Sequence, residues 1–164
     1  MKNRFRLISL LAAFLTGLCI HTSSVLAEDG SSPESVVKAF AGEYFMLDET
    51  MSVYMSEKAL YNENDVNRVD MYLRVKKQEA ASRGLALSYL KMRPILMKTH
   101  VLSKDEDTAV IGFKAVMVRS INPLYRIVGY VFGLIEEHEF QTTVTVVREN
   151  GLWKVGLPGF AFPV

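Results

Sequence analysis

The stretch FQTTVTVVRENGLWKV, residues 140–155, decides the fold of this chain. Residues 140–148 are rich in Val and Thr, whose β-branched side chains favour strands. Asn150-Gly151 follows, and both of these residue types tolerate the positive φ angles of a type I′ turn. Residues 152–155 then supply a second short strand. The stretch therefore predicts a β-hairpin that closes the second half of the chain.

Further strands are predicted upstream of this hairpin. Residues 95–102 are mostly apolar and β-branched, and residues 108–119 follow a charged turn at residues 104–107. We expect these two runs to pair as an antiparallel hairpin. Just before them, Leu85, Leu87 and Tyr89 alternate with smaller residues, which indicates one more short strand.

The first half of the chain has helical spacing instead. Ser32-Pro33-Glu34 offers an N-cap hydroxyl, a proline at the first helical position and an acid in the first turn. We expect a first helix of about four turns after it. Its apolar stripe consists of Val36, Val37, Phe40, Tyr44 and Leu47.

Two more helices are predicted before Gly84. Residues 48–60 indicate a second, shorter helix that starts at Asp48. Asp65 is expected to cap a third helix, over residues 65–82, and Gly84 is a suitable stop for it. Asp70 and Arg74 stand four residues apart on this helix, a spacing that favours an ion pair.

Helices first and antiparallel strands second define an α+β arrangement. This chain resembles the nuclear-transport-factor-two-like superfamily in its order of elements, which is three helices followed by a curved antiparallel sheet, and in the closing hairpin at residues 149–155. In that superfamily the sheet wraps as a cone around the first helix. The resemblance spans residues 33–157 and implies one α+β cone domain over residues 33–164. It implies no single activity, because that cone hosts isomerases, dehydratases, lipid carriers, secretion-system components and inert modules.

The N-terminus predicts an export signal. Lys2, Arg4 and Arg6 precede a mostly apolar run over residues 7–20, which is too short to cross a membrane, and a small residue stands at Ala27. We expect a signal peptide over residues 1–27, a flexible N-terminus over residues 28–32, and export to the periplasm. A lipoprotein would use Cys19 here, but the bulky Leu18 before it disfavours that alternative.

Composition narrows the function classes. Cys19 is the one cysteine, so a chain cleaved after Ala27 has no thiol for disulfides, metal binding or nucleophilic attack. Three of the 19 basic residues and none of the 18 acidic ones lie in the signal, so the net charge changes from +1 to −2 on cleavage. A weakly acidic domain is poorly suited to nucleic acid. No metal or cofactor motif is found, and we expect no cofactor.

Few side chains suit catalysis. His100 shares a strand side with Lys98, which favours a solvated face. His138 shares a side with Glu136, and this pair could make a proton shuttle or half of a metal site, but we expect the cluster to be a solvated strand start. Three aspartates could act as general acids or bases if buried, although helix capping and ion pairing explain them better. They are Asp48, Asp65 and Asp70.

An unusually apolar segment, Ile121–Ile135, separates the last two long strands, and Arg126 is its only charge. Connections of this kind are normally polar. The segment could complete the core, form a lid over an apolar cavity, or contact a membrane or partner. Together with one tyrosine of the first helix it supplies the expected ligand-binding residues, which are Tyr44, Tyr125, Tyr130, Phe132 and Ile135.

The sequence therefore favours an exported, non-catalytic domain that binds a hydrophobic small molecule, such as a lipid, or a protein partner. Two alternatives stay open. One is an isomerase- or dehydratase-like enzyme that uses an Asp or His in the cavity. The other is a membrane-associated component of a transport or secretion system. The family resemblance further implies that two copies could pair through the outer face of the sheet.

Overall fold

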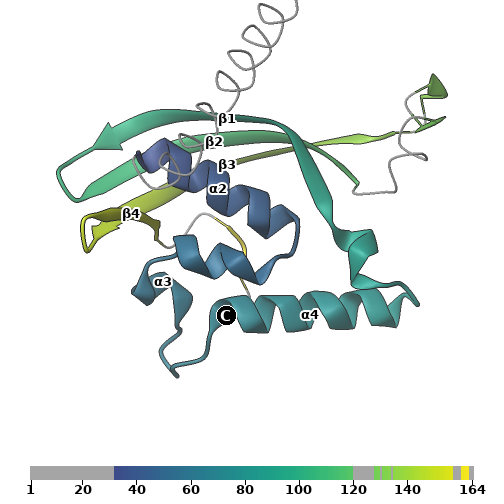
Figure 1. Cartoon of the computed structure of the whole chain (residues 1–164), viewed down its shortest axis with the longest axis horizontal. Helices are drawn as coiled ribbons and strands as arrows, with labels where there is room; N and C mark the ends of the chain where they lie inside the picture. The colour runs from purple at the N-terminus through teal and green to yellow at the C-terminus, as the bar shows by residue number, and fades with distance from the viewer. Residues whose placement is uncertain (1–31, 120–127, 130, 134, 157–159, 163–164) are drawn as a thin grey trace, which may run out of the picture.

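The computed structural model describes residues 32–119, 128–129, 131–133, 135–156 and 160–162, so the predicted signal peptide lies outside the described residues. Helical elements come first and an antiparallel sheet follows (Figure 1), which confirms the predicted α+β class. The elements in chain order are α2 (Pro33–Phe45), η1 (Glu49–Tyr54), α3 (Glu57–Leu60), α4 (Arg68–Ser82), η2 (Leu87–Leu90), β1 (Met92–Lys104), β2 (Thr108–Arg119), β3 (Glu137–Glu149) and β4 (Leu152–Val155).

Helix α2 begins as the sequence predicts. The Ser32 side chain accepts a hydrogen bond from the Ser35 amide at 3.1 Å, and Pro33 occupies the first turn. The Ser35 hydroxyl in turn accepts from the Ser32 amide at 3.2 Å, which completes a reciprocal cap. The helix ends before Leu47, whose φ of 52° turns the chain away.

The single helix predicted over residues 48–60 is wrong. Asp48 does cap a helical segment, since its carboxylate accepts from the Thr50 amide at 3.0 Å, but that segment is the 3₁₀ helix η1. Met55 then becomes extended and bridges to Val155, and the Ser56 amide donates to the Val155 carbonyl at 2.9 Å. This pairing with the C-terminal hairpin interrupts the helix, which restarts as α3.

Helix α4 confirms the third predicted helix, but its cap is Asn67 rather than Asp65. The Asn67 side chain accepts from the Val69 and Asp70 amides at 2.9 and 3.2 Å, while Asp65 adopts a φ of 59° in the preceding turn. The ion pair predicted between Asp70 and Arg74 is not among those formed by the residues that the structure describes.

The predicted stop of α4 at Gly84 is confirmed. Gly84 has a φ of 68°, its amide donates to the Ala81 carbonyl at 2.9 Å, and the Leu85 amide donates to the Ala80 carbonyl at 2.9 Å. These two bonds form the Schellman motif that ends many helices. The strand predicted at residues 85–89 is wrong, because the chain forms the 3₁₀ turn η2 there.

The sheet has the order β1-β2-β3-β4, with every neighbouring pair antiparallel. Both predicted hairpins are confirmed, and Asn150 and Gly151 have the positive φ angles, 52° and 81°, expected of a type I′ turn. Strand β1 forms one edge of the sheet. Its register with β2 shifts twice, between Pro94 and Leu96 and between Val101 and Ser103.

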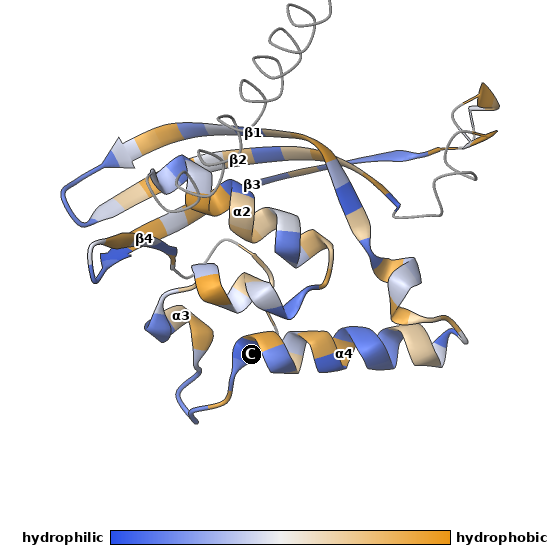
Figure 2. Cartoon of the chain, viewed as in Figure 1, coloured by the Kyte–Doolittle hydropathy of each residue, from blue (hydrophilic) through white to orange (hydrophobic). Residues whose placement is uncertain are grey.

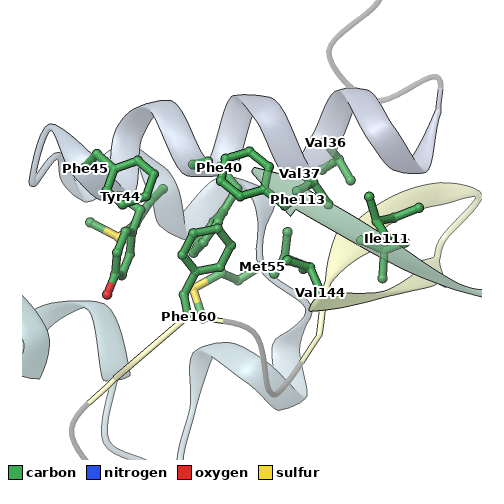
Figure 3. Packing of buried hydrophobic residues seen from close by; sticks show 14 of the residues in the cluster. Val36, Val37, Phe40, Tyr44, Phe45, Met55, Ile111, Phe113, Val144 and Phe160 are labelled. Carbon is green, nitrogen blue, oxygen red and sulfur yellow. The ribbon is translucent and has the colours of Figure 1, made fainter. Parts of the chain in front are cut away.

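Helix α2 lies against one face of the sheet and contacts all four strands (Figure 1). Alternate residues of β2 point toward it and are buried: Ala109, Ile111, Phe113, Ala115 and Met117. The core between these layers contains Val36, Val37 and Phe40 from α2 and Val144 from β3 (Figure 3). All five residues of the predicted apolar stripe are buried in the core, which confirms the stripe, although Leu47 lies beyond the end of α2.

Candidate functional site

The interior between α2, α4 and the sheet is filled by aromatic rings. Phe160 is 7% exposed, and its ring lies 4.8 Å from the rings of both Phe40 and Tyr44 (Figure 3). Edge-to-face and offset-stacked contacts at such distances are favourable beyond the area that they bury. The rings of this aromatic cluster belong to Phe40, Tyr44, Phe45, Tyr72, Phe113, Phe140, Phe160 and Phe162.

Tyr44, an expected ligand-binding residue, joins three parts of the chain. Its ring stacks on Tyr72 of α4 at 4.9 Å with an interplanar angle of 13°, and its hydroxyl donates a 3.0 Å hydrogen bond to the Ala161 carbonyl. Burial raises the pKa of both tyrosines, and the neighbouring Tyr44 raises that of Tyr72 further. Both hydroxyls therefore keep their protons to a higher pH than an ordinary tyrosine does.

The segment Ile121–Ile135 is described only in part, and Tyr125 and Tyr130 lie outside the described residues. The Phe132 amide donates to the Val128 carbonyl at 3.1 Å, which is the bond of one helical turn. Gly133, with a φ of 65°, follows this turn. Ile135 is half-buried and contacts the buried Gly129.

Three apolar side chains of this turn face solvent: Val128 is 50% exposed, Val131 74% and Phe132 70%. Their i, i+3, i+4 spacing places them on one side of the turn. Figure 2 shows this hydrophobic piece at the end of the sheet opposite the β3–β4 hairpin, away from the helices. Val128, Val131 and Phe132 are called the docking turn below.

His100 and His138 lie on opposite faces of the sheet. His100 is exposed and, like Lys98, points away from α2; its imidazole covers Gly112, the position opposite it on β2. His138 is half-buried and stands opposite Met117, on the face toward α2. The next residue, Glu139, points outward and forms a 2.8 Å ion pair with Lys114. No group of three or more potential metal ligands occurs within the described parts of the chain.

The three candidate aspartates are not buried. Asp65 and Asp70 are exposed, and Asp48 is half-exposed at the start of η1. The Thr50 amide, and then the Thr50 hydroxyl, hold the pKa of Asp48 below its usual value. Ser56 is the one buried polar residue among those described, and its hydroxyl accepts from the Ala59 amide at 3.2 Å. It therefore caps α3.

Two open hollows flank α3, with volumes of about 660 and 390 Å³, and they share Lys58 and Glu149. Glu149 accepts a hydrogen bond from the Glu57 amide at 3.2 Å, which ties the β3–β4 hairpin to α3. Acidic and basic side chains both line the larger hollow: Glu57, Lys58, Glu63, Asp65, Arg68 and Glu149. Charged side chains of both signs lie close together in this open hollow, but they do not form one buried charged site.

Sequence reasoning did not identify Phe160 and Phe162 as members of the interior. The available signal was their alternation around Ala161 just after Pro158-Gly159, a pattern in which both rings can point to one side of an extended segment.

Comparison with protein-family models finds no match to this chain, and neither does comparison with curated proteins. Within the described residues, no helix is both long and apolar enough to cross a membrane.

Proposed function

We propose that this chain is an exported, non-catalytic binding domain with the nuclear-transport-factor-two-like cone fold, and that its ligand is a protein partner that docks on Val128, Val131 and Phe132. The contacts of α2 with all four strands of an antiparallel sheet support the cone assignment. Export rests on the basic and apolar pattern of residues 1–27.

The observation that carries the proposal is the exposure of the docking turn. Single exposed apolar residues are ordinary on protein surfaces, but here three adjoin on one side of a turn and two are at least 70% exposed. Burying a Phe or Val side chain stabilises a complex by about 1.5–3 kcal/mol. Together, the side chains of the docking turn provide the apolar centre of a small protein–protein interface.

A protein partner explains the docking turn better than a small apolar ligand does. A carrier encloses its ligand in a concave, mostly apolar pocket. In this domain the space between α2, α4 and the sheet is occupied by the aromatic cluster, and the docking turn points outward instead.

Charge favours a protein over a membrane surface. The exposed carboxylates of Glu136, Glu137 and Glu139 follow the docking turn directly. Biological membranes commonly present anionic headgroups, which repel acidic side chains and attract basic ones. A protein surface with basic residues around an apolar centre would complement both parts of this segment.

Site-specific photo-crosslinking of the full chain in its own cells tests the proposal. A photoreactive phenylalanine replaces Phe132 in one variant and Leu152 in the other, because Leu152 is also apolar and 53% exposed but lies in β4. We expect a discrete protein adduct at position 132 and none at position 152. A lipid adduct, or the same adducts at both positions, would overturn the proposal.

Binding to the purified partner gives the quantitative test. Val131→Asp should weaken the affinity at least about tenfold, since it places a charge in a desolvated apolar interface, while Leu152→Asp should leave the affinity unchanged. An equal effect of the two substitutions would contradict a specific role for the docking turn. An adduct with a second copy of this chain would identify the partner as the chain itself.

A further inference from the structure

The docking turn is packed against a residue that lies just before β3. Ile135 is half-buried and lies against Gly129, which is buried. A β-carbon at Gly129 would lie 2.8 Å from Cγ1 of Ile135 and 3.2 Å from its Cδ1. Carbon atoms in favourable contact are about 3.5–4.0 Å apart, so this arrangement has no room for a side chain at Gly129. The missing side chain therefore sets how closely the turn and Ile135 approach.

Two further features fix the shape of the docking turn. The hydrogen bond from the Phe132 amide to the Val128 carbonyl closes it, and Gly133 turns the chain back with a φ of 65°, which glycine adopts without steric cost. Ile135 is β-branched, so its χ1 angle has few alternatives and the side chain cannot swing freely away from Gly129. These features lie within the chain itself and give the turn its shape without a partner.

The shape of the turn decides whether its apolar side chains act together. Val128, Val131 and Phe132 share one side only while the turn is formed, because their spacing brings them together in helical backbone alone. A segment that orders on binding loses conformational entropy at that step, which lowers its affinity. A preformed turn avoids this loss.

We infer that the docking turn is preformed in the unbound chain, and that Gly129 is the positioning residue that holds it ready by accepting Ile135 against its backbone. The inference rests on the function proposed above, because it assigns a role within the same site. Gly129 is buried, so it acts on a partner through the exposed side chains of the docking turn. Helix propensity alone predicts the opposite effect of Gly129→Ala, since alanine favours a helical turn more than glycine does.

Photo-crosslinking of the full chain in its own cells, with the photoreactive phenylalanine at position 132 as the probe, tests the role of Gly129. Gly129→Ala should lower the yield of the protein adduct at least about threefold, because the added methyl group displaces Ile135 and shifts the turn. Gly42→Ala is the matched control and should leave the yield unchanged, since a β-carbon at Gly42 meets no atom within 4 Å. An unchanged or higher yield with Gly129→Ala would overturn the inference. No adduct in the chain with Gly129 intact would overturn the proposed function instead.

A double variant shows whether Gly129 acts through Ile135. Ile135→Ala removes both atoms that a methyl group at Gly129 would meet. Gly129→Ala should therefore lower the adduct yield when Ile135 is present and have no further effect when Ile135→Ala accompanies it. Equal losses in the two backgrounds would contradict a role through this contact.

A second measurement needs no partner. In the purified, unbound chain, NMR should show a nuclear Overhauser effect between the α-protons of Gly129 and the methyl protons of Ile135, and slowed hydrogen exchange of the Phe132 amide. Gly129→Ala should speed that exchange at least about threefold, and Gly42→Ala should not change it. If the Overhauser effect is missing, or if the Phe132 amide exchanges as fast as in an unstructured peptide, the turn is not preformed and the inference is wrong.

Discussion

The Tyr44 hydroxyl donates a hydrogen bond to the Ala161 carbonyl at 3.0 Å, across a separation of 117 positions in the sequence. It joins the first described helix to the last described segment. The Tyr44 ring also stacks on Tyr72, so one side chain links α2, α4 and the C-terminal segment. A residue with this many long-range contacts should matter for stability whatever the domain binds.

Tyr44→Phe should lower the free energy of unfolding by about 1–2 kcal/mol. The substitution keeps the ring but removes a buried donor and leaves the Ala161 carbonyl without this partner. Urea denaturation followed by circular dichroism measures the loss. Tyr89→Phe is the matched control, because Tyr89 is 53% exposed and should change stability by less than about 0.5 kcal/mol. Equal losses in the two variants would show that the bond contributes nothing.

Alkaline pH should destabilise the domain through Tyr72. Burial raises the pKa of Tyr72 above the ordinary value of 10.0, and the Tyr44 hydroxyl next to it adds to the shift. Below pH 10 both the folded and the unfolded chain keep this proton, so stability does not depend on it. Above pH 10 the unfolded chain releases the proton while the folded chain keeps it, and stability falls as pH rises.

Urea denaturation between pH 8 and pH 11 measures this dependence. Lysines titrate in the same range, so the difference between the unmodified chain and Tyr72→Phe isolates the tyrosine. We expect Tyr72→Phe to lose stability less steeply above pH 10, and Tyr89→Phe to follow the unmodified chain. Parallel curves for the unmodified chain and Tyr72→Phe would refute a buried, protonated Tyr72.

Substitutions at the start of α4 should distinguish its true cap from the predicted one. Asn67→Ala should cost about 1 kcal/mol, because the Asn67 side chain accepts from two amides of the first turn. Asp65→Gly should be neutral or stabilising, since a residue with a φ of 59° is relieved by glycine. Thermal or urea unfolding of both variants provides the comparison. The opposite order of stabilities would restore Asp65 as the cap.

The parts of the fold that could be predicted from the sequence are those with strong local signals. Ser32-Pro33 and Gly84 mark helix ends through capping geometry, and Asn150-Gly151 marks its hairpin through positive φ angles. Where the prediction failed, a distant contact prevailed over local preference. The bridge between Met55 and Val155 breaks the helix predicted at residues 48–60.

The site was harder to predict than the fold. The position of Tyr44 on the apolar stripe of a clear helix predicted its burial, while its role in ligand binding stays a prediction. Its partners come from α4 and from residues 160–162, which no periodicity connects to it. Phe160 and Phe162 follow a Pro-Gly turn, where chain direction is set by tertiary packing. The exposure of Val131 and Phe132 agrees with one of the three alternatives for Ile121–Ile135, but the sequence could not single it out, because apolar runs are usually buried.

The edge of the sheet at β1 has one more consequence. An unpaired strand edge can template the addition of foreign strands, the step from which amyloid-like stacks grow. In β1, Pro94 lacks an amide hydrogen, the register shifts at both ends of the stretch 96–101, and Lys98 places a charge between them. Each of these features discourages backbone pairing with another chain. At this edge of the sheet, the exposed apolar side chains of β1 are therefore not accompanied by a backbone that readily accepts another strand.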